Sequence, residues 1–172
     1  MKIKLSDIAS IAEIIAAIAL VISLVFVGVQ LQDNTKATKS ASAIAASSGI
    51  AQWYMHMGHN GESAVIFRDF IANPDLLTPE EQHRGVLLLH SAMWGFQNNY
   101  YLVKEGTLEQ RIQDSISQSI IIIKDTPGWK HYWLQRRSTF LPEYQRYVDE
   151  LMTSDVSHNA TKLFKNNDEA QP

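Results

Sequence analysis

The chain has 172 residues, enough for one domain with a hydrophobic core and an anchor, but too few for two such domains. Its formal net charge of -3 lacks the strong positive balance that phosphate backbones attract, so nucleic acid is not an expected partner. It contains no cysteine, which excludes disulfides, thiolate metal sites and a cysteine nucleophile.

An apolar run fills residues 8–31, and Glu13 is its single charged residue. As a helix the run would be roughly 36 Å long, while the hydrocarbon core of a bilayer is about 30 Å thick. Glu13 falls near the N-terminal end, where a charge costs far less than at the membrane centre. We therefore predict a transmembrane anchor over residues 1–31, held in a lipid bilayer.

Two other interpretations of this run stay open at the level of sequence. A cleaved signal peptide would use Lys2 and Lys4 as its basic start, but small residues suited to cleavage first occur at residues 40–43. A buried core helix is also conceivable, although β-branched residues on every face fit lipid better than a half-exposed helix.

The side of the membrane on which the domain lies is not resolved by charge. Lys2 and Lys4 flank one end of the run, and Lys36 and Lys39 flank the other, so the positive-inside count is balanced. We expect a cytoplasmic domain, because so short an N-terminal tail is easily translocated.

Residues 32–58 predict a helical extension of the anchor. They are dominated by Ala, Ser, Thr and Lys, and the first glycine after residue 31 is Gly49. Alanine is the best helix former, so the membrane helix should continue until Gly58, Asn60 and Gly61 end it. Small residues recur along this extension at Ala37, Ala41, Ala45 and Ser48.

A helical domain is predicted over residues 62–154. Its first helix, residues 62–72, should bury Val65, Ile66, Phe67 and Phe70 and end before Pro74. The residues Thr78-Pro79-Glu80-Glu81 predict a capped start for a central helix that runs to Glu105. That helix should bury two apolar rows, Val86/Leu89/Met93/Phe96/Tyr100 and Leu87/Trp94/Tyr101.

Three further helices complete the prediction. Thr107 and Gln110 predict a second capping box for a helix over residues 108–125, with Leu108, Ile112, Ile116, Ile120 and Ile123 on one side. Pro127 should begin a helix that contains Trp129, Tyr132 and Trp133, and Pro142 should begin the last helix, which buries Tyr144, Tyr147, Val148 and Leu151. The polar residues 155–172 predict a disordered tail. The fold class is therefore all-α: a transmembrane helix continuous with a long helix, then a small helical bundle.

The chain also resembles an uncharacterised family of short bacterial single-pass membrane proteins. The matching residues of the opening are Ala12, Glu13, Ile14, Ala17, Ile18, Ala19, Ser23, Leu24, Val27, Gly28, Gln30, Asn34, Thr35 and Ala37. Later matches are Pro79, Glu80, Glu81, Asn98, Tyr100, Tyr101, Glu105, Gly106, Pro127, Gly128, Trp133, Phe140, Pro142 and Glu143. The resemblance implies this architecture and a place in a bacterial inner (cytoplasmic) membrane, and it implies no activity. The chain has Gln32 and Asp33 where arginines commonly follow the anchor in that group, which leaves its orientation open.

Histidines provide the metal candidates. His56 and His59 lie three residues apart with Glu62 one turn further, a spacing that suits a metal, but surface histidines at a helix end explain the pattern better, since Gly58 interrupts the helix there. Glu80 and His83 match half of a di-iron motif, but no second Glu-x-x-His pair occurs in the chain. We therefore predict no metal site.

Other polar residues carry further hypotheses. His90 lies between the apolar rows of the central helix, where it could pair with a buried carboxylate. Lys130, Arg136 and Arg137 are basic and lie beside Trp129 and Trp133, so they could meet anionic lipid headgroups or form a solvated face.

No catalytic motif or phosphate loop is present, so we predict neither an enzyme nor a cofactor. We expect an interaction or scaffolding module that associates with itself or with a larger membrane protein. The residues for helix association are Ala12, Ala16, Ala19, Ser23 and Gly28. The alternative is a membrane-tethered ligand-binding or sensory domain whose pocket is lined by Trp94, Tyr101, Trp129 and Trp133.

Overall fold

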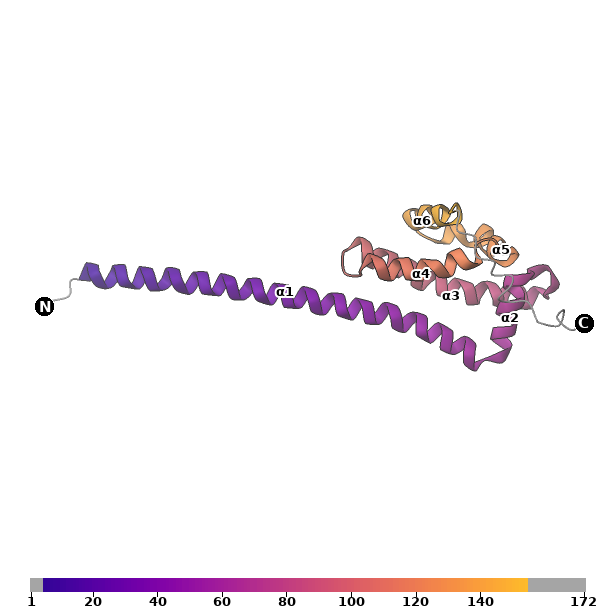
Figure 1. The fold of residues 1–172 in the computed structure, drawn as a ribbon, viewed down its shortest axis with the longest axis horizontal. Coiled ribbons are helices and arrows are strands. Elements are labelled where there is room, and N and C mark those ends of the chain that lie inside the picture. The colour runs from indigo at the N-terminus through magenta and orange to yellow at the C-terminus, as the bar shows by residue number, and fades with distance from the viewer. Residues whose placement is uncertain (1–4, 155–172) are drawn as a thin grey trace, which may run out of the picture. The chain divides into compact units, whose positions relative to one another are not determined.

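The computed structural model describes residues 5–154, and the side chains from residue 8 onward. Every regular element in this range is helical, which confirms the all-α class (Figure 1). The α-helices are α1 (Leu5–His59), α2 (Gly61–Ala72), α3 (Pro79–Lys104), α4 (Gln110–Ile123), α5 (Pro127–Arg136) and α6 (Pro142–Met152). Two short 3-10 helices, η1 (Pro74–Leu76) and η2 (Arg137–Thr139), connect them. The tail predicted for residues 155–172 lies outside the described residues.

Helix α1 is continuous from the apolar run into the predicted extension. The chain nevertheless divides into two units, Met1–Ala41 and Ser42–Pro172, and the boundary falls within this helix. After His59 the chain turns at Asn60, whose side chain accepts a hydrogen bond from the Ser63 amide at 3.0 Å and so begins α2.

The predicted capping box at the start of α3 is confirmed. The Thr78 hydroxyl accepts a hydrogen bond from the Glu81 amide at 3.3 Å, and the Thr78 amide donates to the Glu81 carboxylate at 2.8 Å. Pro79 occupies the first helical position, where its missing amide hydrogen leaves no partner unsatisfied.

The second predicted capping box is wrong. Helix α4 begins at Gln110, with Glu109 before it and no side-chain cap. The Thr107 hydroxyl instead donates to the Leu102 carbonyl oxygen at 3.0 Å, so it closes the end of α3. Gly106, with a φ of 72°, makes the turn between the two helices.

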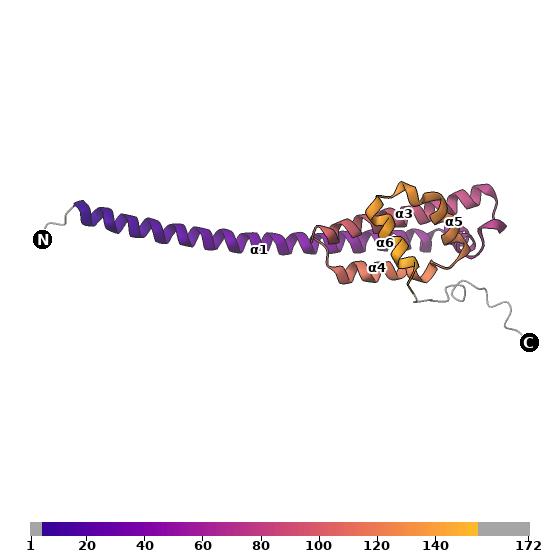
Figure 2. The same cartoon turned by 90° about the horizontal axis from the view of Figure 1, so that it is seen from above.

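Within the second unit, α3 packs against α2, α4 and α5, and α6 packs against α4. Both views show α5 and α6 lying over α3 and α4 (Figures 1 and 2). The core at these contacts is aromatic; its largest fully buried side chains include Phe70, Trp129, Tyr132 and Tyr144. Gly128 lets α5 lie directly on the backbone of α2, because a Cβ there would overlap the Phe70 carbonyl oxygen.

The buried faces of α2 and α3 are narrower than predicted. Val65 is 47% exposed, although Ile66 and Phe70 are buried as expected. On α3 the first apolar row faces the core, but Leu87 and Trp94 of the second row are exposed. The buried large apolar side chains of α3 belong to its first row, which packs against the neighbouring helices. Leu87 and Trp94 of the second row lie on a side that no other described helix covers.

Candidate functional site

The apolar part of α1 is exposed along its whole length. Its large apolar side chains from Ile8 to Leu31 are each between 50% and 66% exposed. Among the described helices, α1 is the one long and apolar enough to cross a membrane, and an 18-residue stretch of it has a mean hydropathy of 2.8. A signal sequence near an N-terminus can also be long and apolar enough to meet this criterion. The interpretation of this run as a buried core helix is wrong, because no residue of that 18-residue stretch is buried.

The small residues predicted for helix association all lie on the exposed surface of this helix. Ala12, Ala16, Ala19 and Ser23 follow one another at intervals of four and three residues, which places them on one side of an α-helix. Gly28 does not extend that row, because at 3.6 residues per turn it falls roughly 160° round the helix from Ala12.

The four aromatic residues predicted to line a pocket do not line one together. Trp129 and Trp133 stack on each other with ring centroids 5.6 Å apart, and both are buried in the core. Trp94 is 54% exposed, and the Tyr101 hydroxyl donates to Glu143 at 3.2 Å on the side of the bundle. Trp129 and Trp133 therefore fill the core, whereas Trp94 and Tyr101 remain at the surface.

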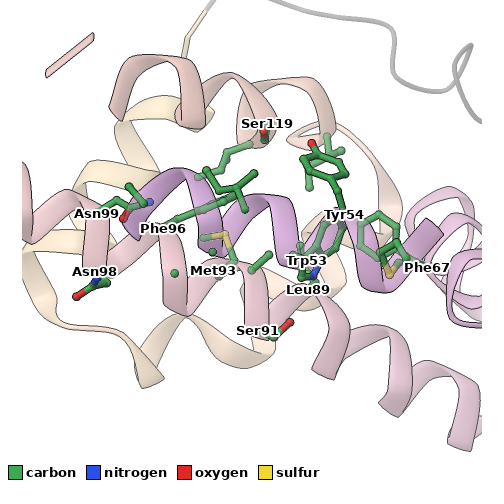
Figure 3. Close-up of a pocket in the computed structure, with 18 of the residues that line it drawn as sticks. Trp53, Tyr54, Phe67, Leu89, Ser91, Met93, Phe96, Asn98, Asn99 and Ser119 are labelled. Atoms are coloured by element: carbon green, nitrogen blue, oxygen red, sulfur yellow. The ribbon is translucent and has the colours of Figure 1, made fainter. Parts of the chain in front are cut away.

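A pocket does exist, between other residues of the second unit. It has a volume of about 520 Å³ and lies between the end of α1 and helices α2, α3 and α4. Its wall includes Trp53, Tyr54, Phe67, Phe96, Asn99 and Ser119 (Figure 3). This size falls in the range of small-molecule sites.

Trp53 fixes the wall of this pocket at the point where three helices meet. Its indole N–H donates to the Leu88 carbonyl oxygen on α3 at 3.0 Å. Its ring lies edge-on to Phe67 of α2 with centroids 5.1 Å apart. The sequence offered one signal for this site, an aromatic pair at residues 53 and 54 within a helix otherwise rich in alanine and serine.

The histidines near the end of α1 do not form a metal centre. His59 Nδ1 lies 2.7 Å from the carbonyl oxygen of Met55, one turn earlier on the same helix. Glu62 pairs with Arg84 of α3, which lowers the pKa of its carboxyl group. Among residues 5–154, there is no group of three His, Cys, Asp or Glu side chains close enough together to hold a metal ion. This holds for His56 and for the Glu80/His83 pair as well.

His90 bonds with aromatic residues and not with the carboxylate considered from the sequence. The Trp94 indole N–H donates to its Nε2 at 2.7 Å, and its Nδ1 lies 2.9 Å from the Tyr132 hydroxyl. Because an indole only donates, Nε2 must be the accepting nitrogen, and the neutral ring carries its hydrogen on Nδ1. Burial, together with the Arg136 guanidinium, lowers the pKa of His90 and favours this neutral form.

In the α5 region the two tryptophans are buried, and one of the three basic side chains is paired with a carboxylate. Arg137 binds Asp149 at 2.6 Å and Gln145 at 2.6 Å, so its charge is already paired. Trp133 donates to the same carboxylate at 2.9 Å and faces the core. The pKa of Asp149 is lowered mainly by its hydrogen bond with Arg137. Lys130 is exposed.

Comparison with known proteins identified no relative of this chain. No family model matches the chain, and neither a curated protein nor a solved structure is significantly similar to it. The resemblance to short bacterial single-pass membrane proteins therefore stays a prediction, and function must be argued from the molecule.

Proposed function

We propose that this protein is a single-pass protein of the bacterial inner membrane that acts as an interaction module through helix–helix association. The observation that supports it is the exposure of the apolar side chains over residues 8–31 of α1. Moving one large apolar side chain from water into an apolar environment is worth about 1.5–3 kcal/mol. A stretch of such residues therefore favours lipid or another protein strongly over water.

A helix is also the form in which a single segment can enter lipid. All backbone groups of residues 8–31 lie within α1, where they are hydrogen-bonded inside the segment. Glu13 sits close to the end of the apolar stretch, within reach of the headgroup region. The domain on residues 42–154 would then be held at the membrane surface, on the cytoplasmic side in our proposal.

Association is proposed to use the row Ala12, Ala16, Ala19 and Ser23. In lipid the apolar surface of a helix gains little by contacting another helix, so close backbone packing over small residues becomes the main attraction. The partner is a second copy of the chain or a larger membrane protein. Gly28 lies on a different side of the helix and is not part of this proposed contact.

The test replaces Ala19 and Ser23 together by isoleucine and measures oligomeric size in mild detergent by light scattering. We expect the wild type to be larger than a monomer and the double variant to be monomeric. Ala17→Ile is the matched control, because Ala17 is an exposed alanine about 140° round the helix from Ala12. If the double variant still associates, or if Ala17→Ile is the variant that becomes monomeric, the proposed contact through this row is contradicted.

A further inference from the structure

The wall of the pocket in the second unit contains several small residues. Ala45, Ala46 and Gly49 of α1 and Ala92 and Gly95 of α3 all belong to it. A Cβ placed on either glycine would meet no atom within 4 Å. The space beside these glycines is therefore not filled by the chain's own residues.

Asn99 is the most buried polar residue in the wall of this pocket. The residue is only 4% exposed, and its side-chain amide forms no hydrogen bond with any residue in the described part of the chain. Asn99 lies at one end of the pocket, whereas Trp53, Tyr54 and Phe67 lie toward the other (Figure 3). A ligand group that reaches this amide would gain a hydrogen bond that the chain itself does not supply.

The charges around the pocket restrict what that group can be. Arg68 is the one charged residue in the wall, and its guanidinium is bound to Asp69 at 2.7 Å and is partly exposed. A carboxylate or an ammonium buried against Asn99 would therefore have no counter-charge, and burying an unpaired charge is strongly unfavourable. An uncharged oxygen faces no such penalty.

We propose that this pocket binds an uncharged, mainly apolar molecule that places one hydroxyl or carbonyl oxygen against Asn99 and its chain between Trp53 and Phe96. Long-chain alcohols and neutral lipid fragments have this chemistry. The amide of Asn99 donates to the oxygen and can also accept from a hydroxyl. The proposal concerns residues 45–123 alone and does not depend on the membrane anchor.

The test uses the full chain in amphipol and three probes of equal chain length: 1-decanol, decanoate and decane. Binding is followed by tryptophan fluorescence, because Trp53 lies in the pocket wall. We expect 1-decanol to bind more tightly than the other two. Asn99→Leu should reduce the preference for the alcohol over the alkane by roughly tenfold, the value of one hydrogen bond. Gln52→Leu, at an exposed amide that is not part of the pocket wall, should leave the preference unchanged.

Gly95→Leu and Gly49→Leu each place a large side chain in the pocket, one from α3 and one from α1. Both should abolish alcohol binding while circular dichroism stays that of the wild type, and either folded variant is sufficient for the test. Tighter binding of decanoate, an unchanged preference in Asn99→Leu, or unchanged affinity in the filled variants would overturn the proposal. Loss of self-association in Gly95→Leu with alcohol binding retained would do so too, since it would make the pocket a contact between copies.

Discussion

Two glycines on α3 offer a matched test of how tightly the helices of the domain pack. An alanine Cβ at Gly85 would lie 2.5 Å from Cγ and 2.6 Å from Cδ2 of Phe70, a side chain with no exposed surface. At Gly95, ten residues further along the same helix, it would meet nothing within 4 Å. The chemical change is the same at both positions, and only the surroundings differ.

The expected effects have opposite signs. Replacing glycine by alanine inside a helix stabilises it by about 1 kcal/mol, and this gain applies to both positions. Carbon atoms normally approach to about 3.5–4.0 Å, so Gly85→Ala forces an overlap of roughly 1 Å with a fully enclosed ring. Overpacking of this kind costs about 1–3 kcal/mol and occasionally more. Because the Phe70 ring is fully enclosed, we take the upper end of this cost, about 3 kcal/mol. We therefore expect Gly95→Ala to be about 1 kcal/mol more stable than wild type and Gly85→Ala, after the helix gain is subtracted, about 2 kcal/mol less stable.

The measurement is urea unfolding of the full chain in detergent, followed by tryptophan fluorescence. Trp53, Trp94, Trp129 and Trp133 are the four tryptophans of the chain, and all lie in the second unit, so the signal reports on the domain. The two variants should differ by about 3 kcal/mol in their free energy of unfolding. Equal stabilities would show that α2 and α3 do not approach as closely as described, and the packing argument would fail.

Three further predictions concern the domain. Gly128→Ala should lower the free energy of unfolding by about 3 kcal/mol or more, because its Cβ would overlap the backbone of Phe70, which cannot rotate away; a wild-type urea midpoint would contradict this. Thr78→Ala should lower it by about 1 kcal/mol through loss of the α3 cap, and Thr78→Ser, which keeps the hydroxyl, should restore most of the loss. The lowered pKa of His90 means that the unfolded chain takes up a proton near pH 6.5 while the folded one does not. Its stabilising effect is therefore complete above that pH and is lost as the pH falls through the folded pKa. Unfolding measured from about pH 7.5 to about pH 5 should show stability falling faster in wild type than in His90→Gln, and parallel curves would refute the assignment.

The helices were predictable because their signals are local. The capping box at Thr78 and Glu81, and proline at the first position of α3, α5 and α6, depend on neighbours within one turn. The Thr107 box failed for a related reason. A threonine hydroxyl can cap the helix before it as well as the one after it, and only the folded turn at Gly106 decides which carbonyl or amide is closer.

The site was not predictable to the same degree, because it depends on contacts between distant elements. Trp129 and Trp94 are equally aromatic and equally placed on a helical stripe, yet one is enclosed by the core and the other has no neighbouring helix to cover it. Trp53 belongs to the pocket because α2 and α3 meet α1 there. Helical periodicity contains no information about which helix lies opposite.

The central claim is that residues 8–31 remain attached and lie in lipid. Alkaline carbonate extraction of bacterial membranes, followed by the intact mass of the retained protein, tests it most directly. The account predicts that the protein stays in the membrane pellet with a mass that includes the apolar run. Release into the supernatant, or a mature chain that begins after that run, would contradict it.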